Sequence, residues 1–158
     1  MKKTNAMRLL DKNKISYNIN EYQYDETDLS ASAMAEKTNL DINKIFKTLV
    51  LLGDKTGFLV ACIPGNKELD LKKLAKLSKN KKIEMIHMKD LIKTTGYVRG
   101  GCSPLGMKKH FPTFIHNTVL DFNSIFISGG KRGLQIEISP TNLIKILDIA
   151  VGDITLDH

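Results

Sequence analysis

The sequence predicts a mixed α/β fold, and three observations lead to that prediction. Short apolar runs that fit β-strands alternate along the chain with short amphipathic segments that fit α-helices. Several neighbouring runs are joined by turn sequences such as 53–57, which indicates hairpins and argues against a purely parallel sheet. The 158 residues contain no repeat, linker or low-complexity segment, so we expect one domain over 1–158.

The elements are predicted from caps, periodicity and turn residues. Side chains that can cap a helix or a helical turn are Thr4, Ser30, Asp41, Asp70 and Ser139, the last followed by Pro140 at the first helical position. The helical segments that we expect follow Thr4 directly and then lie at 31–37, 42–45 (a turn), 71–78, 89–93 and 141–147. The expected strands are 15–22, 47–52, 58–63, 83–86, 113–116, 124–128, 134–138 and a closing strand or extended tail at 148–154. The runs 47–52 and 58–63 should form a hairpin.

Composition places the chain among soluble globular proteins. Hydrophobic residues make up 42% and charged residues 26%. The longest apolar runs, 49–52 and 58–63, are far shorter than a membrane span. No apolar core follows residues 1–5, so the sequence predicts no signal peptide and a cytoplasmic location.

The formal net charge of +7 favours a polyanionic partner, although it also serves simply to keep a small protein soluble. Seven lysines lie between residues 67 and 82, against two acidic residues. Lysine offers point charges to phosphates and does not read bases by bidentate contacts, so this run suits an RNA backbone. The lysines are Lys67, Lys72, Lys73, Lys76, Lys79, Lys81 and Lys82.

Cysteines and histidines give no metal-binding pattern. Cys62 and Cys102 lack the spacing of a metal or redox motif, and in a chain without a secretion signal they are expected to be free thiols. The four histidines (His87, His110, His116 and His158) add no ligand spacing, so we expect neither a metal nor a cofactor. Cys102 lies among glycines and is a candidate nucleophile, with a small apolar filler as the alternative, because no base is spaced to activate it. Cys62 lies in an apolar run and is expected in the core.

Two glycine-rich stretches stand out, at 95–106 and 128–133. Four of the chain's eleven glycines lie in the first stretch, where Pro104 fixes one φ angle. Each stretch is either a tight connection between strands or a stiff loop that holds a ligand through backbone N–H groups. Two such loops leaving neighbouring strands would face each other across one cleft. Neither loop fits a dinucleotide-binding fingerprint.

These loops resemble those of a known family. Thr95-Gly96-Tyr97, Gly100-Gly101 and Ser103-Pro104-Leu105-Gly106 are similar to the first signature loop of the YbaK family of free-standing bacterial Cys-tRNA(Pro) deacylases. Residues 128–133 (SGGKRG) resemble its second loop, and Phe46-Lys47-Thr48-Leu49 resembles its lysine-bearing strand. The resemblance runs nearly end to end. It implies a mixed, largely antiparallel sheet curled into a pseudo-barrel with short helices outside.

The resemblance also implies an activity and partners. It indicates removal of cysteine mischarged on tRNA(Pro), with Cys-tRNA(Cys) as a further substrate, in a ternary complex with prolyl-tRNA synthetase. Neither a membrane nor DNA is expected as a partner. A synthetase pocket discriminates poorly among small amino acids, so a second site must remove errors. The alternatives are a module that binds aminoacyl-tRNA ends without catalysis and a deacylase specific for alanine.

Site residues follow from the same resemblance. Catalysis is assigned to Lys47, Ser128 and Gly129, with Lys47 and loop donors stabilising a tetrahedral oxyanion. Contacts with the acyl-adenosine are assigned to Tyr22, Thr48, Gly100, Gly101, Ser103, Gly130 and Gln135. Contacts with tRNA are assigned to Lys72, Lys73, Lys76, Lys131 and Arg132.

Two of these positions carry open questions. Lys47 begins an apolar strand. Its ammonium group lies either in a cleft or in bulk solvent, which it can reach while its aliphatic stem stays buried. Gln135 stands where close relatives commonly have aspartate, and it keeps an acceptor while losing the negative charge. If that charge binds the substrate amino group or orients a water, activity or selectivity changes; if it is structural, activity stays intact.

The nucleophile is the last expectation. The matched positions contain no serine–histidine or cysteine–histidine pair and no pair of carboxylates. A cysteinyl ester carries its own thiol, with a pKa of about 8.5 in model compounds. The resembling family is thought to use that thiol, which attacks its own carbonyl and leaves as a cyclic thioester.

Overall fold

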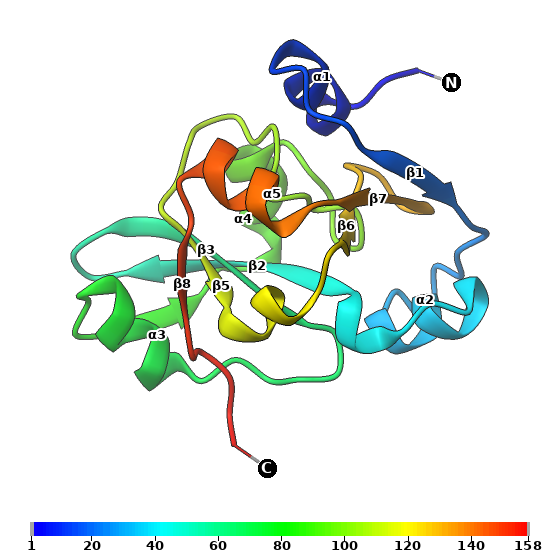
Figure 1. Cartoon of the computed structure of the whole chain (residues 1–158). Coiled ribbons are helices and arrows are strands. Elements are labelled where there is room, and N and C mark those ends of the chain that lie inside the picture. The colour runs from blue at the N-terminus through cyan, green and yellow to red at the C-terminus, as the bar shows by residue number, and fades with distance from the viewer. Residues whose placement is uncertain (1, 158) are drawn as a thin grey trace.

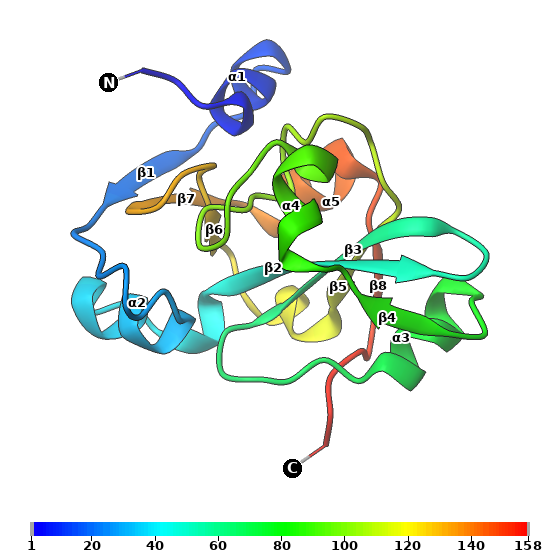
Figure 2. The same ribbon diagram turned by 180° about the vertical axis from the view of Figure 1, so that it is seen from behind.

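The computed structural model describes residues 2–157 and shows short helices packed around two β-sheets (Figures 1 and 2). The α-helices are α1 (Asn5–Lys12), α2 (Ala31–Thr38), α3 (Leu71–Ser78), α4 (Met88–Thr95) and α5 (Pro140–Leu147). The strands are β1 (Asn18–Glu21), β2 (Phe46–Gly53), β3 (Gly57–Pro64), β4 (Ile83–Met85), β5 (Thr113–His116), β6 (Ile125–Ser128), β7 (Leu134–Ile138) and β8 (Ala150–Gly152). Two 3₁₀ helices are η1 (Ile42–Lys44) and η2 (Asn117–Asp121).

The strands form one sheet in the order β1-β7-β6 and another in the order β4-β2-β3-β5-β8. β2 and β3 form the predicted hairpin, with Phe46 opposite Pro64 and Gly53 opposite Gly57. The β1–β7, β6–β7 and β2–β4 pairs are also antiparallel, whereas β3–β5 and β5–β8 are parallel. The prediction of a mixed, largely antiparallel α/β fold is therefore confirmed.

The expected pseudo-barrel is not formed, because over residues 2–157 the two sheets do not join into one closed sheet. The physical reason lies in β2, which pairs with β3 along one edge. At the other edge, β4 occupies the far end of β2, from Leu51 to Gly53. Directly before β2, a single parallel bridge between Ile45 and Phe126 connects the large sheet to the three-stranded sheet. We call the place where the two sheets meet, at Ile45 and Phe126, the seam.

Apolar side chains fill the space on both sides of the large sheet. One cluster joins α1, α5, β6 and β7 to one face of β3, and Leu10, Ile127, Ile136 and Leu143 are fully buried in it. A second cluster packs α3 against the other face of the sheet. Burying such side chains contributes about 1.5–3 kcal/mol each relative to leaving them exposed. The two clusters hold the strands that carry the seam.

Local sequence signals account for most elements. The side chains of Thr4, Ser30, Asp41 and Asp70 accept hydrogen bonds from backbone N–H groups of the turns that follow them. Ser139 makes no such bond, although Pro140 does begin α5 as predicted. The helix η2 was not expected from the sequence. None of the helices within residues 2–157 has the length and apolar character needed to cross a membrane.

A buried histidine ties the C-terminal segment after β8 to β5. Nδ1 of His116 accepts the Ile154 N–H at 3.2 Å, and its Nε2 lies 3.3 Å from Thr155 Oγ1. This arrangement requires neutral imidazole with its proton on Nε2. Burial lowers the pKa of His116; Asp153 opposes that shift, and Lys67 and Lys73 reinforce it.

Stability should therefore decrease when the solution is acidified below the ordinary histidine pKa of about 6.5. The folded pKa is the lower one, so between the two values the unfolded chain binds more protons, and stability is complete only above that window. We expect up to about 1.4 kcal/mol of lost unfolding free energy per pH unit within the window. Urea denaturation between about pH 5 and 8 measures it.

The matched control exchanges an exposed histidine. His110→Gln should keep the wild-type pH profile, because His110 is exposed. His116→Gln should be less stable near neutrality and should lose most of the pH dependence. A wild-type profile in His116→Gln would assign the dependence to other groups.

Candidate active site

The seam between the sheets brings together residues distant in sequence. Ile45 and Phe126 are bridged in parallel, and Lys47 and Ser128 each lie two residues beyond this isolated bridge. Alternate residues of a strand share a face, and bridged residues point to the same side. Lys47 and Ser128 therefore lie on one face, at the mouth of the seam.

Polar residues of the small sheet extend this face. Gln135 pairs with Asn20 on β1 and with Ser128 on β6, which forms a row of three polar residues across the sheet. Tyr22 follows β1; its N–H donates to the Gly133 carbonyl at 2.9 Å, and its ring packs on the cluster of Met34, Ile45 and Phe126. The structure thus gathers Tyr22, Ser128, Gln135 and Lys47.

The ammonium of Lys47 is largely uncommitted. Its Nζ donates one long hydrogen bond, 3.4 Å, to the Gly65 carbonyl. Burial lowers the pKa of Lys47, and Glu68 partly opposes that shift. A half-buried ammonium with free N–H groups can stabilise negative charge that develops beside it.

Gln135 presents a buried acceptor without a partner. Its side chain is 5% exposed, and Oε1 makes no hydrogen bond within the described chain. An unpaired buried carbonyl costs about 1–3 kcal/mol, so it favours a ligand that supplies a donor. Thr48 Oγ1 is also unpaired. However, Thr48 faces the side of β2 opposite Lys47, paired across the hairpin with Cys62, so it is not brought to the face that carries Lys47.

The second glycine loop joins β6 to β7, and two of its backbone donors are occupied. Gly129 N–H donates to the Leu134 carbonyl at 2.9 Å, and Gly130 N–H donates to Ser128 Oγ at 3.2 Å. The sequence assigned both glycines to substrate or oxyanion contacts, but these two N–H groups hold the loop. The Ser128 hydroxyl accepts one of these bonds and still has its own proton to donate, whereas the Gly129 N–H is already engaged.

The first glycine loop packs directly on the second. A Cβ added to Gly101 would lie 2.9 Å from backbone carbons of Lys131. In addition, Nε of Arg132 donates to the Arg99 carbonyl at 2.8 Å. The two loops are therefore in direct contact. The sequence predicted that both loops leave strands and face each other across a cleft, but the first loop follows α4 and packs against the second. Gly100 has a φ of +84° and lies against the side chain of Leu29, where a shallow pocket extends to Tyr22.

Ser103 and Gly101 shape the first loop, because the Ser103 hydroxyl is buried and the Gly101 N–H is engaged. Ser103 is fully buried and its Oγ accepts the Leu105 N–H at 3.2 Å. Gly101 N–H donates to the Val98 carbonyl at 3.0 Å. Tyr97 stiffens the same loop with a 2.6 Å hydrogen bond from its hydroxyl to the Leu105 carbonyl. Of the predicted contact residues of this loop, Gly100 is the exposed one.

Neither cysteine is an activated nucleophile. Burial raises the pKa of Cys102 to about 11 and that of Cys62 to about 12. The thiolate is the nucleophilic form, so both thiols are inert near neutral pH. Within residues 2–157, no three or more histidine, cysteine or acidic side chains are grouped to hold a metal ion. His158 lies outside the described residues.

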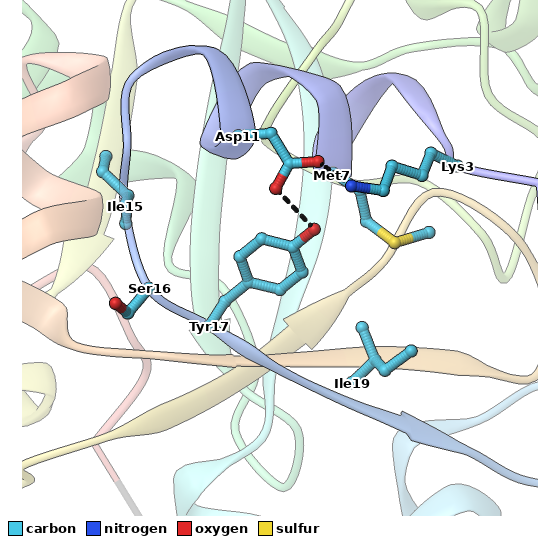
Figure 3. A pocket seen from close by; sticks show the side chains of 7 residues that line it. All are labelled: Lys3, Met7, Asp11, Ile15, Ser16, Tyr17 and Ile19. Carbon is cyan, nitrogen blue, oxygen red and sulfur yellow. Dashed lines mark hydrogen bonds and ion pairs between the residues drawn. The ribbon is translucent and has the colours of Figure 1, made fainter.

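Another pocket lies elsewhere, between α1 and β1, and has a volume of about 520 Å³ (Figure 3). Its ionisable side chains satisfy one another: Lys3 pairs with Asp11, which also accepts the Tyr17 hydroxyl at 3.0 Å. Ile19 on its floor pairs with Ile136, on the sheet face opposite Gln135. This pocket is therefore separate from the seam.

The predicted lysine run does not join the site. Lys72, Lys73 and Lys76 lie on α3, at the end of the molecule away from β6 and β7 in both views (Figures 1 and 2). Moreover, Lys73 Nζ is held by Asp153 at 3.0 Å and Asp157 at 3.1 Å. In contrast, Lys131 and Arg132 lie in the second glycine loop itself.

Sequence reasoning missed two contributors. Thr4 caps α1 as predicted, yet its hydroxyl also donates to the Gly129 carbonyl at 2.5 Å, and no local signal indicates that contact. Asn20 completes the polar row with Gln135 and Ser128. Its signal was available, because Asn20 directly follows the apolar Ile19 in the predicted strand 15–22, and successive residues of a strand face opposite sides.

Comparison with known proteins identifies the family of this site. The family model described as "Aminoacyl-tRNA editing domain" matches residues 26–146, which include both glycine loops and Lys47. The chain belongs to the aminoacyl-tRNA editing domain family. This confirms the family resemblance found in the sequence.

Individual relatives of this editing domain agree. The chain is 52% identical over 153 residues to the "Putative Cys-tRNA(Pro)/Cys-tRNA(Cys) deacylase EbsC" of Enterococcus faecalis, covering 97% of this chain and 93% of that protein. A stretch of 76 residues, 48% of this chain, is 33% identical to 13% of a "Proline--tRNA ligase" of Thermosipho africanus. The solved structure of "a putative trans-editing enzyme for prolyl tRNA synthetase" superposes with a TM-score of 0.86 at 20% identity, over 99% of this chain and all of that one.

Proposed function

We propose that this editing domain removes cysteine from mischarged tRNA(Pro), and from Cys-tRNA(Cys), by letting the substrate thiol attack its own ester. One observation carries the proposal. The seam offers a desolvated ammonium, a serine hydroxyl and a buried acceptor, yet both cysteines have raised pKa values and are inert. Such a site serves a substrate that brings its own nucleophile. The name of the Enterococcus faecalis relative supports the same substrate.

The reaction needs little from the protein beyond shape and charge. The substrate thiol loses its proton to solvent, and its sulfur attacks the ester carbonyl to form a tetrahedral oxyanion. Lys47 and the Ser128 hydroxyl stabilise this oxyanion. The bond to the ribose oxygen then breaks, that oxygen takes a proton, and the amino acid leaves as a cyclic thioester. Because burial lowers the pKa of Lys47, its ammonium is a stronger acid than a free lysine and suits that proton transfer.

Gln135 is the proposed recognition point for the amino end of the substrate. An α-amino group can donate to the unpaired Oε1, which restores the hydrogen bond that the folded chain lacks. Tyr22 and Gly100 would form the adjacent wall, near the terminal adenosine. The resemblance to part of a proline–tRNA ligase supports a partnership with prolyl-tRNA synthetase.

Deacylation assays on Cys-tRNA(Pro), Ser-tRNA(Pro) and Ala-tRNA(Pro) test the mechanism. The protein with both Cys62→Ala and Cys102→Ala should keep most Cys-tRNA(Pro) cleavage, because neither thiol reacts. The rate should rise about tenfold per pH unit below the thiol pKa of about 8.5. Serine should be released at least about a hundredfold more slowly, because a hydroxyl is far less acidic than a thiol.

The results also separate the alternatives. A folded Cys102→Ala protein without activity, or serine released as fast as cysteine, would refute the substrate-thiol mechanism. Faster release of alanine than of cysteine would indicate an alanine-editing enzyme. Binding of all three without cleavage would indicate a recognition module.

A further inference from the structure

A second group of basic residues surrounds the glycine loops. Between Asp90 and Glu137 the sequence contains six basic residues and a single acidic one, Asp121. The basic residues are Lys93, Arg99, Lys108, Lys109, Lys131 and Arg132. Lys93 is paired with Asp90 at 2.9 Å. The other five form what we call the loop-side basic surface (Arg99, Lys108, Lys109, Lys131 and Arg132).

The fold gathers these five residues beside the seam. Arg99 and Arg132 are joined by the 2.8 Å hydrogen bond from the Arg132 Nε to the Arg99 carbonyl. The backbone of Lys131 lies against Gly101. The aliphatic stem of Lys108 packs over Gly96. A Cβ added to Gly96 would lie 3.4 Å from the Lys108 Cγ. Arg99, Lys108, Lys109 and Lys131 are exposed, so their charges face solvent.

The lysines of α3 are a weaker anion surface than their number suggests. Lys73 is neutralised by Asp153 and Asp157, and its Nζ also donates to the Thr155 carbonyl at 2.8 Å. Asp70, at the start of α3, lies directly beside Lys72 and Lys73, because its carboxylate accepts hydrogen bonds from their backbone N–H groups. This surface also lies away from the glycine loops (Figures 1 and 2).

We propose that the acceptor stem of the tRNA lies on the loop-side basic surface, and that α3 does not hold it. This inference rests on the proposed function, since the scissile ester is at the 3′ end of the tRNA. The phosphates nearest that ester must lie next to the cleft, and the loop-side basic surface borders it. Lysine and arginine contacts to phosphates fix position without reading sequence, which suits an enzyme that recognises an acyl end.

Two variants of equal charge test the proposal. The loop-side variant changes Arg99, Lys108 and Lys109 to glutamine. The α3 variant changes Lys72 and Lys76 of α3, and Lys82 shortly after that helix, to glutamine. Binding of uncharged tRNA(Pro) is measured between about 50 and 200 mM salt. The loop-side variant should bind at least about tenfold more weakly at low salt, and its salt slope should fall by about two to three, since each lost phosphate contact removes about 0.7–0.9. The α3 variant should keep the wild-type slope.

A small substrate separates this inference from the proposed function. Cysteine esterified to adenosine lacks the phosphates, so both variants should deacylate it at the wild-type rate. If the wild-type protein does not deacylate this small substrate, the proposed function itself is refuted. A flattened slope in the α3 variant, with a wild-type slope in the loop-side variant, would overturn the inference. Lys109→Glu, a single change at an exposed loop position, provides the same comparison if the triple loop-side variant fails to fold.

Discussion

Replacing Lys47 by alanine should lower the rate of Cys-tRNA(Pro) deacylation by at least about a hundredfold, the scale of one lost oxyanion contact. The ammonium is half-buried near the seam, and only one long hydrogen bond engages it. Removing its charge leaves the developing oxyanion with the Ser128 hydroxyl alone. Single-turnover rates at saturating enzyme measure the loss in the chemical step.

Two companion variants separate charge from folding. Lys47→Met keeps the aliphatic stem and should be as inactive as Lys47→Ala, because the charge is what matters. Lys55→Met, in the exposed turn of the β2–β3 hairpin, removes an equal charge and should keep full activity. All three should unfold close to the wild-type temperature. A folded Lys47→Met protein with the wild-type rate would exclude Lys47 from the mechanism.

Gly101→Ala should have the second large effect, because its methyl group would meet backbone and not a side chain that can move. The added Cβ would lie 2.9 Å from backbone carbons of Lys131 and 3.0 Å from the Arg132 nitrogen. The two glycine loops must then separate. Overpacking of this kind costs about 1–3 kcal/mol of stability. A displacement of about 1 Å in a site can cost about a hundredfold in rate, so we expect a loss of that order.

Gly57→Ala is the matched control. Gly57 has a φ of +72° and no atom within 4 Å of an added Cβ. Alanine there should cost about 1–2 kcal/mol through the left-handed backbone, with no change in rate. Thermal melts and single-turnover assays on both variants provide the comparison. If Gly101→Ala deacylates at the wild-type rate, contact between the loops is not needed for catalysis.

The predictions that were confirmed rest on local signals. Thr4, Ser30, Asp41 and Asp70 cap their helices because each side chain reaches N–H groups two or three residues away. The β2–β3 hairpin follows from the turn at 53–57. That the two glycine loops meet was expected from the family resemblance, although only the second loop follows a strand and the first follows α4.

What the sequence could not show depends on contacts between distant residues. The hydrogen bond from the Gly129 N–H to the Leu134 carbonyl depends on the conformation of the turn between β6 and β7. The capture of Lys73 by Asp153 and Asp157 depends on where the C-terminal segment lies, some eighty residues further along. The split edge of β2, which keeps the sheets from closing, likewise depends on which strand reaches it first. No periodicity or spacing encodes these outcomes.

The contact between Thr4 and Gly129 has a consequence for the order in which the protein folds. The two residues are 125 positions apart, and β1 likewise pairs with β7 across most of the chain. Closing so long a loop is slow compared with forming a local hairpin such as β2–β3. During synthesis the large sheet can begin to form while the seam still lacks one side. Catalytic competence should therefore appear only after β7 has left the ribosome, as the final step of folding.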